Sequence, residues 1–290
     1  MPNLCDVRHI REVLARHGFR FSKQRGQNFL TDPSVAERMA ESVKEDNAVL
    51  EIGPGFGALT AELCKNAGHV VAVEVDRLLL PVLRENLSAC RNLTLVEGDA
   101  LKLPLESLMP EGLEPVVCAN LPYSVTSPLL ARLLECEKFG GITVMVQREV
   151  AQRLCAAAGT PEYGAFTLFA GVYARPEILF EVPPDCFTPR PAVHSAVLRL
   201  SRHSHPVIPK EMRPLFLRVV KAAFAQRRKT LANALSAGLS LPRDTVVQCI
   251  ESAGISPGVR GETLDGGQYL LLARSFAPVI AGKNAPRSAL

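Results

Sequence analysis

The clearest candidates for chemistry begin with a glycine-rich segment, GPGFG at 53–57, between an apolar run at 48–52 and a helical run at 58–68. Glycine adopts positive φ without steric cost and lets the backbone come close to a ligand. The amide groups at the start of the following helix would face the same ligand. Gly53 and Gly55 are therefore candidate contacts to a cofactor.

Two acidic residues stand where the next two strands are expected to end. Glu74 lies 21 residues after Gly53, and Asp99 closes the apolar run at 93–99. A carboxylate at position 74 can accept hydrogen bonds from both ribose hydroxyls of a nucleotide-like cofactor. A carboxylate at position 99 could accept an adenine amino group, or it could simply cap a helix. Because the glycine segment also fits G-x-G-x-x-A, three possibilities stay open: S-adenosylmethionine, a nicotinamide dinucleotide, and a tight turn without ligand.

The next strand end carries Asn120-Leu121-Pro122-Tyr123, which looks like the N/D-P-P-Y/F-type signature of amino-group methyltransferases. Taken with five other segments, it makes the chain resemble the KsgA-type family of ribosomal RNA adenine dimethyltransferases, which act on the small ribosomal subunit. These segments are GQNFL (26–30), EIGPGFGALT (51–60), GDAL (98–101), FTPRPAVHSAV (187–197) and FAQRRKTLANAL (224–235). The resemblance begins near residue 18 and covers nearly all of the remaining chain, and six ordered segments make it specific.

The resemblance implies S-adenosyl-L-methionine as cofactor, with Gln27, Asn28 and Leu30 lying over it. The other contacts that it implies are Gly53, Glu74, Asp99 and Asn120. Without the resemblance, GQNFL would be interpreted only as a loop with one buried phenylalanine. One departure is the segment SVTSP at 124–128, where the family usually carries N-I-S/T-S/T-P. This change is conservative and leaves the expected catalytic residues in place.

The expected reaction explains the residue types at this strand end. An exocyclic adenine N6 is a poor nucleophile because its lone pair is delocalised into the ring. Two acceptors on its N–H groups, the Asn120 side-chain oxygen and the carbonyl of Leu121 or Pro122, would localise that lone pair. Pro122 fixes the backbone that presents the carbonyl. Tyr123 offers a stacking face for an extruded base, and Phe187 could close the other side. The alternatives are a turn with a packed tyrosine and a phenylalanine that belongs to the core.

These residues need a fold that brings successive strand ends together. Apolar runs alternate with helical runs, which predicts an α/β fold with a doubly wound, mostly parallel, seven-stranded Rossmann-like sheet. The runs expected in parallel are 48–52, 70–76, 93–99, 115–123 and 142–147. The connection between the runs 177–183 and 194–200 has no room for a helix, so these two should form an antiparallel pair at the end of the sheet.

Helices and domain limits can be read from the flanking sequence. A helix is expected over 6–17, and another from Thr31-Asp32-Pro33 towards Val43, with Asp32 as N-cap. Between them, 19–30 reads as a basic loop. The linker-like segment SRHSHPVIP at 201–209 suggests two domains, 1–205 with an N-terminal basic extension over 1–30, and a helical domain over 206–290 that contacts RNA. The tail from residue 281 should fray.

The charge distribution indicates a polyanionic partner. The net charge is +4, but residues 1–30 carry +4 and residues 202–243 carry +8, which leaves −8 elsewhere. Residues 214–237 read as one long helix with an arc of about 100° that could contact phosphates. This arc contains Arg218, Lys221, Arg228 and Lys229. Arg227 projects into the opposite, apolar arc, where it could pair with a carboxylate or reach across domains, although it is also a candidate RNA contact. A solvated helix face is the alternative for the other four.

Several classes of protein are excluded. No run of 18 apolar residues could span a membrane, and the N-terminus lacks the uninterrupted apolar core of a secretory signal. The eight cysteines are scattered and include no C-x-x-C pair, which favours reduced thiols in a cytoplasmic protein and argues against a zinc site or a disulfide framework. The HSH triplet at 203–205 is not expected to bind a metal.

We therefore expect a monomeric, cytoplasmic, S-adenosylmethionine-dependent enzyme. By the resemblance, it would dimethylate N6 of two adjacent adenosines near the 3′ end of 16S rRNA in the assembling small ribosomal subunit. One alternative is a 23S rRNA adenine methyltransferase of the macrolide-resistance type. A second is a nicotinamide-dependent dehydrogenase, which Asn120-Leu121-Pro122-Tyr123 opposes. A third is a non-catalytic RNA-binding assembly factor, which the intact Asn120, Tyr123 and Glu74 oppose.

Overall fold

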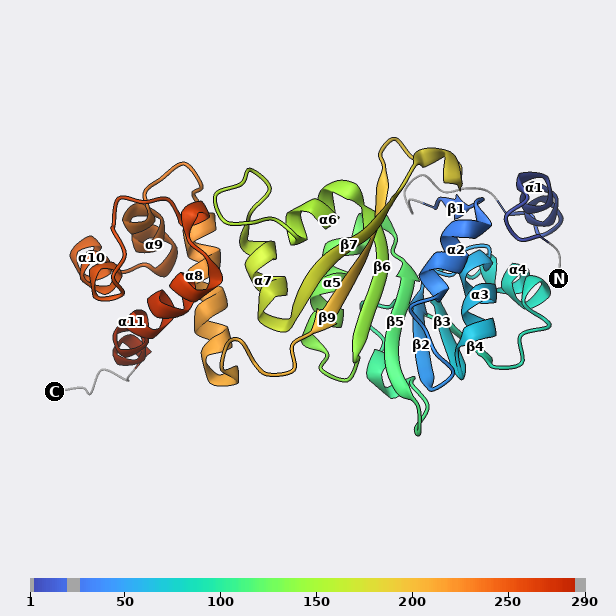
Figure 1. Cartoon of the computed structure of the whole chain (residues 1–290), viewed down its shortest axis with the longest axis horizontal. Helices are drawn as coiled ribbons and strands as arrows, with labels where there is room; N and C mark the ends of the chain where they lie inside the picture. Colours follow the sequence, from blue (N-terminus) through green and yellow to red (C-terminus); the bar gives the residue numbers. More distant parts are fainter. Residues whose placement is uncertain (1–2, 20–26, 285–290) are drawn as a thin grey trace. The chain divides into compact units, whose positions relative to one another are not determined.

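A computed structural model describes residues 3–19 and 27–284 of the chain (Figure 1). The chain divides into two compact units. The first comprises residues 1–151 and 175–202, and the second comprises residues 152–174 and 203–290. Much of the basic loop expected over 19–30 falls in residues 20–26, and the expected frayed end falls largely in 285–290; both lie outside the described residues.

The first unit is built on a seven-stranded sheet in the order β4-β3-β2-β5-β6-β9-β7. Strands β2 to β6 pair in parallel, and β9 runs antiparallel to β6 with Gly141 opposite Ser201. Strands β7 and β9 are neighbours that run in opposite directions (Figure 1). The strands are β2 (Asn47–Ile52), β3 (His69–Glu74), β4 (Leu93–Glu97), β5 (Glu114–Asn120), β6 (Gly141–Gln147), β7 (Ala174–Val182) and β9 (Ser195–Arg202). The predicted doubly wound, mostly parallel sheet and its antiparallel end are thus confirmed.

Helices alternate with the parallel strands of this unit. They are α1 (Val7–Arg16), α2 (Pro33–Ala40), α3 (Ala58–Asn66), α4 (Leu79–Asn86), α5 (Thr126–Glu135), the start of α6 (Arg148–Leu154), and the short 3-10 turns η2 (Leu105–Ser107), η3 (Tyr123–Val125) and η4 (Pro184–Cys186). Helix α2 begins as its sequence predicts, because the Asp32 side chain accepts a hydrogen bond from Ser34 N at 3.0 Å and Pro33 occupies the first helical position. A second, two-stranded sheet pairs β1 (Phe29–Leu30) with β8 (Phe187–Thr188) in antiparallel fashion.

The second unit is helical around its own apolar core, in which Phe216, Tyr269 and Phe276 are fully buried. Its elements are the end of α6, α7 (Ala165–Tyr173), η5 (Lys210–Met212), α8 (Arg213–Phe224), α9 (Leu231–Leu239), α10 (Arg243–Ser252), η6 (Gly261–Thr263) and α11 (Gly266–Asn284). No helix in residues 3–19 or 27–284 combines the length and the apolar character that crossing a membrane requires.

The single long helix expected over 214–237 is wrong, since α8 ends at Phe224 and α9 begins at Leu231. Thr230 is extended, and the Leu231 amide donates to the Val259 carbonyl at 2.7 Å. The start of α9 therefore finds its acceptor in a distant loop rather than in a preceding helical turn. Helices α8 and α9 pack against each other, and a Cβ placed on Gly238 would lie 2.6 Å from Ala222 Cβ.

Residues 152–174 belong with the helical unit, although the sequence places them in a first domain that ends at residue 205. Tyr163, Leu168 and Val172 are buried in the same apolar cluster as Phe216. The Tyr163 hydroxyl also donates to the Leu264 carbonyl at 2.8 Å. The second unit is thus built from two separate segments of the chain. Sequence order alone does not indicate that the first of them, residues 152–174, belongs to it.

Candidate active site

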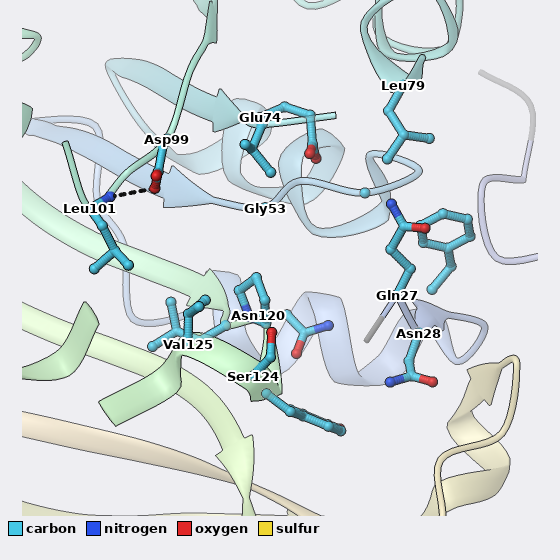
Figure 2. A pocket seen from close by; sticks show the side chains of 16 residues that line it. Gln27, Asn28, Gly53, Glu74, Leu79, Asp99, Leu101, Asn120, Ser124 and Val125 are labelled. Carbon is cyan, nitrogen blue, oxygen red and sulfur yellow. Dashed lines mark hydrogen bonds between the residues drawn. The ribbon is translucent and has the colours of Figure 1, made fainter. Parts of the chain in front are cut away.

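A cleft of about 370 Å³ lies where four successive parallel strands end (Figure 2). Gly53 follows β2, Glu74 ends β3, Asp99 follows β4 and Asn120 ends β5. In Figure 2, Asp99 and Leu101 lie at one end of the cleft, and Gln27 and Asn28 lie at the other. The lining residues are Gln27, Asn28, Phe29, Gly53, Gly55, Glu74, Val75, Leu79, Asp99, Leu101, Asn120, Leu121, Pro122, Tyr123, Ser124 and Val125.

The glycine segment is packed so closely that an added Cβ would press on its neighbours. Gly53 and Gly55 have φ of +72° and +60°, in the region that favours glycine. A Cβ on Gly53 would lie 3.3 Å from Pro122 Cγ, and a Cβ on Gly55 would lie 3.0 Å from Phe29 Cδ1. The loop after β2 is therefore pressed between the turn after β5 and the strand β1.

Buried carboxylates shape one side of the cleft. Glu74 is 4% exposed, and burial raises its pKa although backbone amides donate to it, Asp76 N at 2.8 Å among them. Asp76 in turn accepts a hydrogen bond from the Gln27 side chain at 2.9 Å. Asp99 is more exposed; it accepts from Leu101 N at 2.9 Å (Figure 2) and pairs with Lys102 at 3.5 Å. Asp99 thus both caps its own turn and lines the cleft.

The turn after β5 presents an acceptor that lacks a partner. Among the described residues, nothing donates to the buried Asn120 Oδ1. The Pro122 carbonyl already accepts from the Thr126 hydroxyl at 3.0 Å and from Val125 N at 3.2 Å. Leu121 is buried, and its amide donates to the Met145 carbonyl at 3.0 Å, which anchors the turn to β6. Asn120 thus lines the cleft with a side-chain oxygen that accepts no hydrogen bond from the described residues.

The ring of Tyr123 is fixed at the cleft by its own hydroxyl. Tyr123 Oη and the fully buried Ser195 Oγ share a hydrogen bond of 2.6 Å. Burial raises the pKa of Tyr123, so the phenol stays neutral at ordinary pH. A neutral aromatic face held in one orientation suits stacking against a planar group.

Phe187 and Leu30 are not brought into this cleft. They face each other in the β1–β8 pair and are 4% and 5% exposed, within the apolar core of the first unit. Leu30 instead lines a much smaller cavity beneath the glycine loop. In this structure Phe187 secures the strand that carries Phe29, and its ring is not offered to a base.

The basic residues expected to contact RNA fall into two groups. Arg218 and Lys221 are exposed on α8, whereas Arg228 and Lys229 are exposed in the turn over 225–230. Arg227 has a different environment, because its Nε donates to Glu262 at 2.5 Å and its Nη2 donates to the Pro161 carbonyl at 2.6 Å. The common stripe along one helix does not exist, since the helix breaks between the two groups.

Sequence reasoning missed several residues that shape the site. Val75, Leu79 and Leu101 give the cleft its apolar walls. Asp76 and Glu51 can be noticed in the sequence, because each is an acid in or directly after a mostly apolar run. No group of three or more His, Cys, Asp or Glu that could hold a metal occurs within 3–19 and 27–284.

Comparisons with known proteins agree with this geometry. The sequence model of the family described as "Ribosomal RNA adenine dimethylase" matches residues 18–277. "Ribosomal RNA small subunit methyltransferase A" of Lachnoclostridium phytofermentans is 43% identical over 282 residues, which are 94% of this chain and 97% of that protein. The protein of the same name from Geobacillus thermodenitrificans is 41% identical over 279 residues, 93% of this chain and 95% of that protein.

Two solved structures are similar over most of the chain. A dimethyladenosine transferase from Plasmodium falciparum has a TM-score of 0.74 at 25% identity, covering 86% of this chain and 98% of that one. The 23S rRNA methyltransferase ErmE has a TM-score of 0.67 at 28% identity, covering 86% of this chain and all of that one.

Proposed function

Since this chain belongs to the ribosomal RNA adenine dimethylase family, we propose that it dimethylates N6 of two adjacent adenosines near the 3′ end of 16S rRNA. It is an enzyme that uses S-adenosyl-L-methionine as methyl donor. The observation that carries the choice of the small subunit is the 43% identity to small-subunit methyltransferase A over nearly the full length. Identity to the 23S rRNA methyltransferase is only 28%, which disfavours the resistance-type alternative.

The cleft suits this donor in shape and charge. Its acids are Glu74 and Asp99, and none of its described lining residues is basic. A site of this kind favours a cation over a phosphate-bearing dinucleotide. We assign Glu74 to the ribose hydroxyls and Asp99 to the adenine amino group, with Gln27, Asn28, Gly53 and Gly55 closing around the rest. When bound, the donor supplies an electrophilic methyl group on a sulfonium.

The turn after β5 would activate the nucleophile. The orphan Asn120 Oδ1 accepts one N6 hydrogen of the target adenine, and a main-chain carbonyl accepts the other. Because the Pro122 carbonyl already accepts two hydrogen bonds, we assign the second role to the Leu121 carbonyl. Both acceptors localise the N6 lone pair for in-line attack on the methyl carbon. Tyr123 stacks on the flipped base, and Phe187 acts indirectly by holding β1.

No strong base is required, because the protonated product amine is acidic and loses its proton readily. The rate enhancement then comes from positioning the two reactants and from oriented acceptors in a site shielded from water. In this assignment, activation of the nucleophile depends on Asn120 and not on a side chain that gains or loses a proton.

The helical unit would supply affinity for RNA. Arg218, Lys221, Arg228 and Lys229 are exposed and suited to phosphate contacts. Arg227 would hold the turn over 225–230 in place, since its guanidinium bridges Glu262 and the Pro161 carbonyl. We further infer that the enzyme works as a monomer in the cytoplasm, where small subunits assemble.

The decisive experiment is transfer of labelled methyl groups from S-adenosylmethionine to small subunits that lack the modification, followed by mapping of the labelled bases. We expect label on two adjacent adenosines near the 3′ end of 16S rRNA. Label on 23S rRNA would instead select the resistance-type activity. Tight binding of the subunit without any transfer would select a non-catalytic assembly factor.

A further inference from the structure

Glu51 is a carboxyl group buried in the middle of the apolar strand β2. All six residues of this strand are buried, and Glu51 itself is 1% exposed. Its Oε2 and the hydroxyl of the nearby Thr60 have no hydrogen bond of good geometry among the described residues, although the hydroxyl lies close enough to lower the pKa of the carboxyl group somewhat. Burying a carboxylate without a partner destabilises the folded protein. Its position two residues before Gly53 therefore suggests that Glu51 has a functional role.

Glu51 lies against a small cavity that adjoins the main cleft. This cavity has a volume of about 30 Å³, and Glu51 and Asn120 both line it. Within the described part of the chain, neither Oε2 of Glu51 nor Oδ1 of Asn120 has a hydrogen-bond partner. Asn28, Phe29, Gly53, Gly55 and Asn120 line both this cavity and the cleft. A single water molecule fits such a volume, and it would connect the carboxyl group to the donor site.

The groups around Glu51 oppose its negative charge. Burial and the Glu74 carboxylate on β3 raise the pKa of Glu51 to about 8, and the Thr60 hydroxyl on α3 offsets only part of this rise. The other titratable groups that sense it are the thiols of Cys64 on α3 and Cys118 on β5, whose pKa values its charge helps to raise. None of the described residues lining either cavity is basic. In the free protein near neutral pH, Glu51 is therefore mostly the neutral acid.

We propose that Glu51 is a charge-sensing residue that favours the cationic methyl donor over the neutral spent product, by releasing its proton when the donor binds. This inference rests on the proposed use of S-adenosylmethionine. The donor carries a sulfonium and an ammonium against one carboxylate, so its net charge is +1. After methyl transfer the sulfonium is a thioether and the net charge is zero. The carboxyl O–H of Glu51 breaks on donor binding, its proton leaves to solvent, and it returns once only the thioether remains.

Linkage fixes the direction of the effect. A ligand that binds the ionised form more tightly gains affinity as pH rises towards the pKa of the free group. The ratio of the product Kd to the donor Kd should therefore rise between about pH 6 and about pH 8, by at most about tenfold per pH unit.

The test is calorimetric titration of the full-length protein with S-adenosylmethionine and with S-adenosylhomocysteine. Running each titration in two buffers of different ionisation enthalpy gives the protons released on binding. Near pH 7 we expect donor binding to release most of one proton more than product binding does. In Glu51→Gln, which keeps the size of the side chain, this excess should vanish and the pH dependence of the Kd ratio should flatten. Titration of the ligands is common to both proteins, so the difference isolates Glu51.

Asp99→Asn is the matched control, because it removes a carboxylate that lines the main cleft but not the small cavity beside Glu51. We expect it to weaken both ligands and to leave the pH dependence of their ratio intact. If Glu51→Gln does not fold, infrared difference spectroscopy of the wild-type protein decides. The carbonyl stretch of a protonated carboxyl group should be lost on adding donor and kept on adding product. Equal proton release for the two ligands, or an unchanged carboxyl band with donor, overturns the inference. Failure of wild-type protein to bind either ligand would overturn the proposed function instead.

Discussion

The two units handle charge in opposite ways. In the first, acids such as Glu74 and Glu51 are nearly inaccessible and are held by the ends of neighbouring strands. In the second, basic groups such as Arg228 and Lys229 are exposed on a turn. Charges in a buried medium of low polarity interact strongly and are little screened, whereas exposed charges are weakened by water and salt. The first arrangement suits recognition of one small cation, and the second suits attraction of a large polyanion.

The largest effect should come from removing the orphan acceptor of the first unit. In Asn120→Ala, we expect methyl transfer to fall by about 10²–10³-fold or more, the size typical for the loss of one oriented hydrogen-bonding group. Donor affinity should fall only moderately, because the other cleft residues remain. Single-turnover transfer and calorimetric binding separate these two effects. Ser124→Ala, which alters another lining residue, should retain turnover, and near-normal turnover in Asn120→Ala would refute the acceptor mechanism.

The next largest effect should come from reversing exposed positive charges of the second unit. In the double charge reversal Arg228→Glu and Lys229→Glu, we expect affinity for the small subunit to fall by tenfold or more. The slope of log K against log salt should become shallower by about 2, since each phosphate contact contributes roughly one. Donor binding in the first unit should not change. Arg91→Glu, an exposed reversal just before β4, is the control, and an unchanged salt slope in the double variant would contradict the RNA role.

The sequence predicts the two units unequally for physical reasons. Parallel strands bring their carboxyl ends to one edge, so the order of the strands alone predicts that Gly53, Glu74, Asp99 and Asn120 meet there. The distances between these four residues follow from the spacing of neighbouring strands in the sheet. Cofactor contacts such as Gln27 rested on family resemblance alone, and the structure ties this side chain to Asp76.

Helical periodicity, by contrast, does not reveal where a helix breaks. The run over 214–237 keeps its apolar period through the turn, and the break comes from a long-range hydrogen bond between Leu231 and Val259. Tertiary contacts also decide that Arg227 pairs with Glu262 and that residues 152–174 belong to the second unit. The burial of Phe187 is another, because it depends on pairing with Leu30 across the chain.

A smaller effect should come from the backbone that shapes the donor site. Gly55→Ala adds a Cβ 3.0 Å from Phe29 at a positive φ. We expect a loss of about 1–2 kcal/mol in unfolding free energy and weaker donor binding, as the loop must shift. Gly112→Ala is the matched control, because Gly112 also has positive φ but no atom within 4 Å of the added Cβ. It should cost stability alone. Equal donor affinity in the two variants would show that the loop does not approach the cofactor.

The last effect concerns how the stability of the first unit changes with pH because of its buried acids. Burial raises the pKa of folded Glu51 from 4.5 to about 8, so the folded state binds more protons than the unfolded state in this range. Unfolding free energy should therefore fall as pH rises from about 4.5 to about 8, by up to roughly 1.4 kcal/mol per pH unit. Glu51→Gln stays neutral and should lose this slope, whereas Glu62→Gln, which alters a carboxylate paired with Lys65 on α3, should keep it. Urea unfolding across the range measures both slopes. Parallel pH profiles for Glu51→Gln and wild type would mean that Glu51 is already ionised in the folded protein. The contrast between the two units would then rest on Glu74 and no longer on Glu51.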